Sequence, residues 1–280
     1  MKYAFLMVGQ SNMAGRGYAH EVAPIINENI LMLRNGRWQM MEEPINFDRS
    51  VSGVGLASSF ASAWCKDHLN DQIGLIPCAE GGTCIDEWAI DEPLFQHAIN
   101  EAKFALKDST LVGILWHQGE NDSFEGRHVT YQDKLKTIMD AFRLELDCPN
   151  IPIIVGGLPD FLGRYGFGKG CIEYKEINQA LKDYVDSESN AYFVDAADLQ
   201  SNPDGIHINA LSQRKFGLRY YDAFINAHNV LQPLANEELC LRELEAKEYS
   251  KNEKIFCLSK RLVLGDITYE EFVQQLTTIQ

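Results

Sequence analysis

The sequence is poor in positive charge and has no long apolar run. Its 280 residues carry 25 Lys and Arg against 40 Asp and Glu, a formal net charge of −15. Nucleic-acid-binding proteins need a basic surface to displace phosphate counterions, and modules that bind membrane surfaces are also basic. No stretch approaches the roughly eighteen apolar residues that a membrane-spanning helix needs. The expected partner is therefore neither nucleic acid nor membrane.

Cysteine is scattered, and signals for metal binding and export are missing. The seven cysteines form no C-x-x-C pair, and no two histidines have metal-ligand spacing on one helix face. We therefore expect no disulfide framework, no metal and no cofactor, and a reducing cytoplasm is the compartment that fits. The apolar run before Gly9 is too short for a signal peptide, and no small-residue cleavage site follows it.

What is present is typical of a soluble globular chain, with 45% hydrophobic and 23% charged residues. Segments with helical spacing of apolar residues alternate with short apolar runs, which indicates right-handed βαβ units and a parallel sheet between two helical layers. Ligands of such sheets bind at the carboxyl ends of the strands. The expected strands are Tyr3–Val8, Ile73–Cys78, Leu111–Trp116, Ile151–Val155 and Ala191–Val194, and the helical patterns cover 56–64, 94–106, 131–142 and 174–185.

Beyond Pro233 the strand-like runs stop. We expect a domain over residues 1–232 and a helical appendage over 233–280, built from two or three short helices. Gly265 is typical of a helix end, and Thr268 with Glu271 forms the pattern of a capping box. One short motif of the appendage resembles helical modules that mediate oligomerisation, so a homo-oligomer through these helices is one expectation. A helical hairpin packed on the core is the other.

Polar residues follow the first two expected strands. Ser11 lies at a strand-to-helix turn, where its hydroxyl can stand clear of the sheet or serve only as a helix N-cap. Gly81 and Gly82 let the backbone approach a ligand closely, or form only a tight turn. The nucleophile motif G-x-S-x-G is absent, because Met13 stands where its second glycine belongs.

The third and fifth strands are followed by further candidates. Gln118 can donate an amide N–H and Glu120 is a carboxylate at the same edge, while His117 between strand and turn fits a structural histidine. Asp204 lies three residues before His207 and can hold its Nδ1–H, which leaves Nε2 free as a base. A serine, a glycine pair, an amide and an Asp/His pair at one edge are the set that acyl transfer requires.

Four blocks of the sequence together resemble the carbohydrate esterase family six branch of the SGNH hydrolases, which includes sialate O-acetylesterase and acetylxylan esterase domains. The resemblance runs in order from about residue 1 to 230 and implies a flavodoxin-like three-layer α/β/α sandwich with a five-stranded parallel sheet. The blocks are Gly9–Gly15, Gly81–Trp88, His117–Glu120 and Asp204–His207.

The resemblance also implies roles for individual residues. Ser11 would be the nucleophile, His207 the general base and acid, and Asp204 the residue that orients His207. The oxyanion hole would consist of the backbone N–H groups of Ser11 and Gly82 and the side chain of Gln118, which replaces the asparagine of the wider superfamily.

Three further residues would support the site. Asn12 and Gly81 flank the nucleophile and the oxyanion loop. Glu120 would either brace the site from behind or hold a substrate hydroxyl. Cys84 occupies a position where many relatives carry a small hydroxyl residue. The sequence does not decide whether its thiol contacts the substrate.

The expected activity is the removal of O-acetyl groups from a carbohydrate, such as acetylxylan, through an acetyl-serine intermediate. The alternatives are a sialate O-acetylesterase, a lipid or thioester hydrolase, and an inactive carbohydrate-binding module. Tryptophans and tyrosines that could stack on sugar rings favour a carbohydrate over a lipid, and the intact triad argues against an inactive module. The net charge favours a neutral sugar. The tryptophans are Trp38, Trp88 and Trp116, and the candidates for a sialic carboxylate are Arg16 and Arg49.

The sequence of one glycine-rich stretch, Gly163–Gly170, is close to the motif of a phosphate-binding P-loop. Gly170 stands where Ser or Thr must bind Mg²⁺, and the stretch lies several residues beyond its strand. We therefore expect a mobile loop that borders the acyl site, with a slack surface segment of no function as the alternative.

Overall fold

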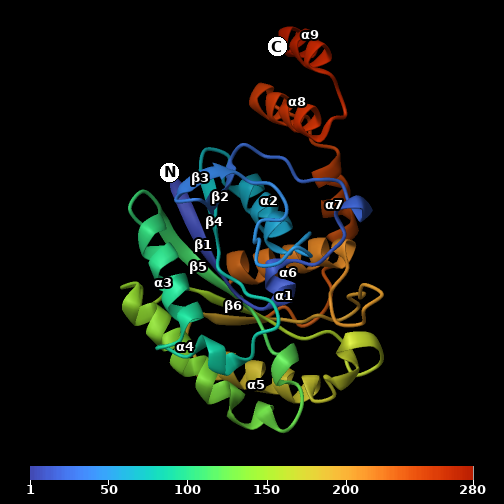
Figure 1. Ribbon diagram of the computed structural model, residues 1–280. Helices are drawn as coiled ribbons and strands as arrows, with labels where there is room; N and C mark the ends of the chain where they lie inside the picture. Colours follow the sequence, from blue (N-terminus) through green and yellow to red (C-terminus); the bar gives the residue numbers. More distant parts are fainter. Residues whose placement is uncertain (280) are drawn as a thin grey trace.

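A seven-stranded sheet forms the centre of the computed structural model, which describes residues 1–279 apart from the side chain of Glu245 (Figure 1). The strand order is β3-β2-β4-β1-β5-β6-β7, and all neighbours are parallel except β2 and β3. The strands are β1 (Lys2–Gly9), β2 (Ile30–Arg34), β3 (Arg37–Met40), β4 (Gln72–Pro77), β5 (Thr110–His117), β6 (Ile153–Gly156) and β7 (Ala191–Val194).

The predicted strand count was wrong by one hairpin. All five expected strands are present, but β2 and β3 add an antiparallel hairpin at the edge of the sheet. Its turn is Asn35-Gly36, with φ of 54° and 70°, the combination that a tight two-residue hairpin turn requires. β3 has no fully buried residue and lacks a continuous apolar run. β2 has such a run, Ile30–Leu33, and was missed as well.

Helices cover both faces of the sheet, as expected for three layers (Figure 1). One layer contains α2 and α6, which pack on each other, and the other contains α3, α4 and α5. Each predicted helical pattern corresponds to a helix of the structure. The bounds are α2 (Ala57–Asp67), α3 (Pro93–Ala105), α4 (Tyr131–Glu145), α5 (Tyr174–Ser187) and α6 (Ala210–Asn226).

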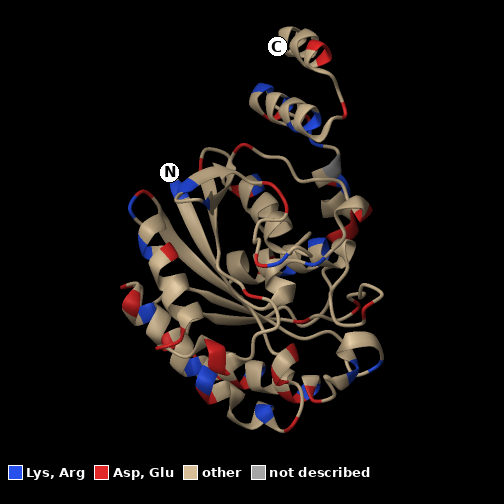
Figure 2. Cartoon of the chain, in the orientation of Figure 1, with Lys and Arg blue, Asp and Glu red and all other residues tan. Residues whose placement is uncertain are grey.

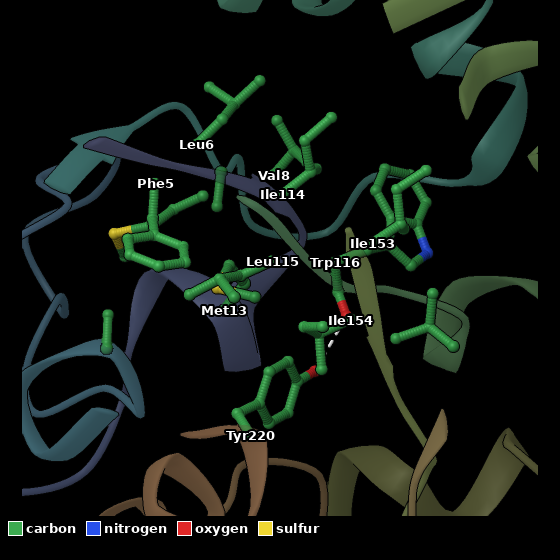
Figure 3. Packing of buried hydrophobic residues seen from close by; sticks show 14 of the residues in the cluster. Phe5, Leu6, Val8, Met13, Ile114, Leu115, Trp116, Ile153, Ile154 and Tyr220 are labelled. Atoms are coloured by element: carbon green, nitrogen blue, oxygen red, sulfur yellow. Dashed lines mark hydrogen bonds between the residues drawn. The ribbon is translucent and has the colours of Figure 1, made fainter. Parts of the chain in front are cut away.

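Alternate residues of the central strands pack into opposite layers (Figure 3). Phe5 of β1 contacts Phe60 of α2 and Phe224 of α6, at ring-centroid distances of 4.7 and 4.9 Å. Trp116 of β5 packs on the other side, where its indole N–H donates to the Tyr131 hydroxyl at the start of α4. The central strands carry almost no charged residues, whereas both signs of charge are spread over the helices (Figure 2). Burial on both faces explains the uninterrupted apolar runs.

The C-terminal segment forms three helices, α7 (Glu237–Glu245), α8 (Lys251–Leu264) and α9 (Tyr269–Thr278). Gly265 ends α8 with φ of 80°, and Thr268 and Glu271 form a capping box at the start of α9, as predicted. Figure 1 shows α8 and α9 projecting from the body of the molecule. The homo-oligomer through these helices stays a prediction.

α7 is tied to the body by a buried ion pair. Arg219 of α6 donates from Nε to Glu237 Oε1 at 2.6 Å, and the two side chains are 1% and 6% exposed. A boundary between residues 232 and 233 would separate these partners. Across residues 1–279, no helix combines the length and apolar content needed to cross a membrane.

Breaking this ion pair should destabilise the whole fold. Glu237→Ala leaves the Arg219 guanidinium buried without its partner, which typically costs about 3–5 kcal/mol. Glu238→Ala is the matched control, because Glu238 is exposed and its surface ion pair with Lys215 contributes little to stability. Urea unfolding measures both. Equal small losses would contradict the integration of α7 into the core.

Candidate active site

The serine after β1 stands at the carboxyl edge of the central strand. Ser11 is the first residue of a short helix, α1 (Ser11–Ala14), and the N-cap residue is Gln10. Ser11 is therefore not the N-cap that its position also allowed. Gly9 has φ of 129°, and a Cβ there would lie 2.1 Å from the carbonyl oxygen of His117. Glycine thus lets the ends of β1 and β5 approach closely enough to set the turn at Ser11.

Ser11, His207 and Asp204 form one hydrogen-bonded line. His207 Nε2 lies 3.1 Å from Ser11 Oγ, and His207 Nδ1 lies 2.7 Å from Asp204 Oδ2. The three residues predicted to act together therefore meet, although 196 positions separate the serine from the histidine. In this arrangement Nδ1 donates to the carboxylate and Nε2 can accept the serine proton.

Asp204 is held in its charged form. Partial burial opposes ionisation, but the backbone N–H groups of His207 and Ile206 donate to Asp204 Oδ1 at 3.0 and 3.1 Å. These bonds, with the imidazole of His207, outweigh burial and hold the pKa of Asp204 below its usual value. The carboxylate therefore stays ionised at neutral pH and orients the ring.

Asn12 joins the nucleophile turn to the His207 loop. Its Nδ2 donates to the carbonyl of Ile206 at 3.1 Å, and its Oδ1 accepts the N–H of Ile208 at 2.9 Å. The two backbone groups flank His207 on either side. Asn12 therefore sets the distance between the histidine and the serine that precedes Asn12 in the chain.

Glu120 lies behind the site and not in it. Its side chain is fully buried, and Oε1 accepts from Asn12 Nδ2 at 2.5 Å and faces His117 Nε2 at 3.3 Å. Burial disfavours the charge, yet the His117 imidazole and the Asn12 amide stabilise it and lower the pKa of Glu120. A carboxylate without exposed surface is not placed to hold a substrate hydroxyl. Of the two predicted roles, the structure favours bracing through Asn12.

The glycine pair presents an open backbone donor. Gly82 has φ of 81°, and a Cβ added there would meet no atom within 4 Å. Among residues 1–279, neither the N–H of Gly82 nor that of Ser11 donates to a protein acceptor. Both N–H groups are therefore free of protein acceptors, as the donors of an oxyanion hole must be.

Gln118 does not take its predicted place as an oxyanion donor. The side chain is fully buried, and its Nε2 faces Asp122 Oδ2 at 2.6 Å, Thr83 O at 3.1 Å and Gln10 Oε1 at 3.2 Å. An amide nitrogen has only two hydrogens, so these acceptors leave none for a ligand. Gln118 instead braces the turns after β1, β4 and β5 against one another.

Asn121 carries the side-chain amide that sequence reasoning missed. It is half-buried, and its Nδ2 donates to the carbonyl of Gly82 at 2.6 Å, which leaves one amide hydrogen free. It lies three residues beyond Gln118, where the chain turns at Gly119 with φ of 144°. The dense run of polar residues after β5 was the signal, but only the structure shows which amide contacts the Gly82 loop.

The tryptophans do not form the expected sugar platform. Trp88 and Trp116 are fully buried in the core. Trp38 packs over Gly74 at the hairpin edge and donates its indole N–H to Asp108. Stacking of these residues on a sugar ring is therefore excluded by their positions.

The candidate arginines are both engaged. Arg16 is 4% exposed and paired with Asp48, so it is not free for a sialic carboxylate. Arg49 is half-exposed, but its Nη2 donates to the carbonyl of Gly81 and to Glu80.

The glycine-rich stretch is packed on the turn that carries Asp204. A short 3₁₀ helix, η5 (Gly166–Gly170), lies against this turn, and Phe167 N–H donates to the Asp204 carbonyl at 2.8 Å. A Cβ at Gly166 or Gly168 would lie 2.0 Å from a carbonyl oxygen of the turn. The glycines thus permit close packing beside the site.

Cys84 begins another short helix, η2 (Ile85–Trp88), where its N–H donates to Glu87 at 2.8 Å. Partial burial raises the pKa of its thiol. In the described part of the chain, no three His, Cys, Asp or Glu side chains group as metal ligands.

A mostly parallel α/β sheet with an aligned serine, imidazole and carboxylate at its carboxyl edge has the architecture of a serine hydrolase. The sequence profile of the family described as "Carbohydrate esterase, sialic acid-specific acetylesterase" matches residues 1–226. The chain belongs to this family, and the resemblance found in its four sequence blocks is confirmed.

Individual relatives agree with this assignment. A protein of Arabidopsis thaliana named "Probable carbohydrate esterase" is 31% identical over 248 residues, which cover 79% of this chain and 90% of the relative. Its X-ray structure superimposes with a TM-score of 0.70 at 29% identity, over 80% of this chain and 98% of that one. The structure of NanS shares the fold, with a TM-score of 0.65, 17% identity and coverage of 81% and 97%. The structure of a carbohydrate acetylesterase of Xanthomonas citri also shares the fold, with a TM-score of 0.60 at 17% identity, over 81% of this chain and 56% of that one.

The lowered pKa of Asp204 predicts a pH dependence of stability. As the pH falls, the unfolded chain binds this proton first, so Asp204 adds stability above about pH 4 that is lost as the pH falls through the folded-state pKa. Asp204→Asn removes this titration. Its urea midpoint should decline less steeply than that of the wild type between about pH 5 and pH 2.

The control is Asp91→Asn, at an exposed aspartate outside the site. Its midpoint should follow the wild type. Parallel curves for all three proteins would contradict a stabilised Asp204 carboxylate.

Proposed function

We propose that the protein is a serine esterase that removes O-acetyl groups from carbohydrates. The observation that carries the proposal is the hydrogen-bonded line from Ser11 Oγ through His207 to Asp204, at 3.1 and 2.7 Å. Membership of the carbohydrate esterase family supports it. A binding module would have no use for an aligned nucleophile and base, so the same line argues against an inactive carbohydrate-binding protein.

The first half of the reaction transfers the acetyl group to the serine. Ser11 Oγ attacks the acetyl carbonyl carbon as His207 Nε2 takes the hydroxyl proton, and the carbonyl oxygen becomes an oxyanion. When the tetrahedral intermediate collapses, the bond to the sugar oxygen breaks and His207 returns the proton to that oxygen. Asp204 stabilises the imidazolium during both transfers.

The second half releases acetate. Water attacks the acetyl-serine while His207 accepts its proton, and collapse of the second intermediate breaks the bond to Ser11 Oγ, which takes that proton back from His207. In both halves, the N–H groups of Ser11 and Gly82 would stabilise the oxyanion, with the free amide hydrogen of Asn121 as the third donor. Preorganised donors of this kind contribute most when they need not move as charge develops.

The charge distribution supports a neutral sugar such as acetylxylan over an anionic one. The chain carries a net charge of −15, and the buried guanidinium of Arg16 is neutralised by Asp48. Sialate O-acetylesterase activity is the second candidate, since the family description names sialic acid. A lipid or thioester hydrolase of the same fold is the third.

Substrate profiling separates these candidates. We expect acetate release from acetylated xylo-oligosaccharides to exceed release from O-acetylated sialic acids, and p-nitrophenyl acetate to be cleaved faster than the octanoate. Preference for sialic acids would select the second candidate. Preference for the octanoate would select the third.

Single substitutions should reduce kcat in a defined order. Ser11→Ala and His207→Ala should each cost on the order of 10⁶, as in a comparable triad. Asp204→Asn should cost about 10⁴, because it favours the wrong tautomer of His207. Asn121→Ala should cost about 10²–10³, the usual effect of losing one oxyanion donor. Hydrolysis of p-nitrophenyl acetate measures all four.

The control for the amide is Asn226→Ala, an exposed position on α6 that should leave kcat unchanged. Equal and mild losses in all four site variants would overturn the assigned roles.

A further inference from the structure

The loop that carries Gly82 is held by side chains of one short segment. Asn46 accepts the N–H of Ala79 and donates to its carbonyl, both at 2.9 Å, and Asp48 Oδ2 accepts the N–H of Gly81 at 2.8 Å. Asn46 is 4% exposed and the Asp48 side chain 1%. We call residues 46–49 the clamp.

The last residue of the clamp acts on the peptide that contains the oxyanion donor. Arg49 Nη2 donates to the carbonyl of Gly81 at 2.8 Å. A trans peptide is planar, so the N–H of Gly82 points away from that carbonyl. Holding the carbonyl of Gly81 therefore sets the direction of the Gly82 N–H.

Asp48 of the clamp also belongs to a buried ion pair with Arg16. Arg16 donates from Nη2 to Asp48 Oδ2 at 2.5 Å and from Nη1 to Oδ1 at 3.1 Å, and Ser52 also donates to Oδ1. Burial opposes the charge of Asp48, but these donors outweigh it and lower its pKa. Asp48 thus presents a fixed, charged acceptor to the N–H of Gly81.

Arg16 connects this acceptor to the rest of the site. It follows the nucleophile helix, and its carbonyl accepts from Asn202 Nδ2 at 2.8 Å. Asn202 N–H in turn donates to the carbonyl of His207 at 2.7 Å. Arg16 therefore connects the loop that carries His207, through Asn202, with the loop that carries Gly82, through Asp48.

The absence of a side chain at Gly81 has a specific cause. A Cβ at Gly81 would lie 2.4 Å from Arg16 Nη2 and 2.8 Å from Asp48 Oδ2. The ion pair thus occupies the space on one side of the loop. The space beside Gly82 is open.

We propose that Arg16 and Asp48 are positioning residues of the oxyanion hole: their ion pair, through the clamp, aims the N–H of Gly82 at the developing oxyanion. The inference rests on the proposed serine-esterase function. Stability alone does not require this pair, because apolar residues of similar volume often replace a buried ion pair without loss. Only the charged pair offers a fixed acceptor to the N–H of Gly81.

The test is the double variant Arg16→Met/Asp48→Leu, which removes both charges and leaves neither buried alone. With p-nitrophenyl acetate, kcat should fall by about 10²–10³, the effect of losing one oxyanion donor, with KM within about twofold of the wild type. The pH dependence of kcat should keep its midpoint, because the Ser11, His207 and Asp204 line is untouched.

A second substrate reports on the oxyanion hole itself. In p-nitrophenyl thionoacetate, sulfur replaces the carbonyl oxygen and accepts hydrogen bonds from N–H groups poorly. The wild type should therefore strongly prefer the oxygen ester, and the double variant should lose most of this preference. A purely structural defect would lower the rates with both esters equally.

The matched control is Arg219→Met/Glu237→Leu, which removes a buried ion pair of similar exposure far along the chain, between α6 and α7. Its ester preference should equal that of the wild type. If the site variant fails to fold, Arg49→Met tests the same peptide from a half-exposed position, with a smaller loss of kcat and of ester preference expected.

The inference is overturned if kcat of the folded site variant stays within about twofold of the wild type, or if its ester preference is unchanged. The same holds for an unchanged preference in Arg49→Met. Ester hydrolysis that persists in Ser11→Ala would instead overturn the proposed function, so the two failures are distinguishable.

Discussion

The arrangement of the site depends on the three hydrogen bonds of Asn12. This side chain joins the turn after the first strand to backbone groups on both sides of His207, at 3.1 and 2.9 Å, and its amide is fixed by Glu120 at 2.5 Å. The partners come from segments 108 to 196 positions away in the sequence. A nucleophile and a base on separate loops keep hydrogen-bond distance only if such a link exists, and buried bonds of this kind are costly to break.

The unpaired N–H groups of Ser11 and Gly82 impose a second constraint on the site. A loop is normally rigid because its own polar groups pair with one another, but the donors of an oxyanion hole must stay unpaired. The clamp resolves this conflict by holding the neighbouring backbone groups from outside. Rigidity then comes from Asn46, Asp48 and Arg49, and the N–H of Gly82 stays free for the reaction.

Periodicity and local motifs predicted five of the strands, the helices of both layers and the Ser11, Asp204 and His207 line, because continuous apolar runs and polar residues after strands are local signals. The edge strand β3 was missed since its exposed face removes the apolar run. Gln118 was misplaced because its orientation depends on Asp122 and on the turn at Gly119, which no local pattern encodes. The clamp could not be predicted from the sequence for a similar reason, because Asp48 and Gly81 are 33 residues apart.

The most direct measurement is the mass of the protein quenched with acid during its first turnover of p-nitrophenyl acetate. We expect one added acetyl group, found by peptide mass spectrometry on Ser11 and absent in Ser11→Ala. An acetyl group on another residue, or steady hydrolysis with no acetylated protein and full activity in Ser11→Ala, would contradict it.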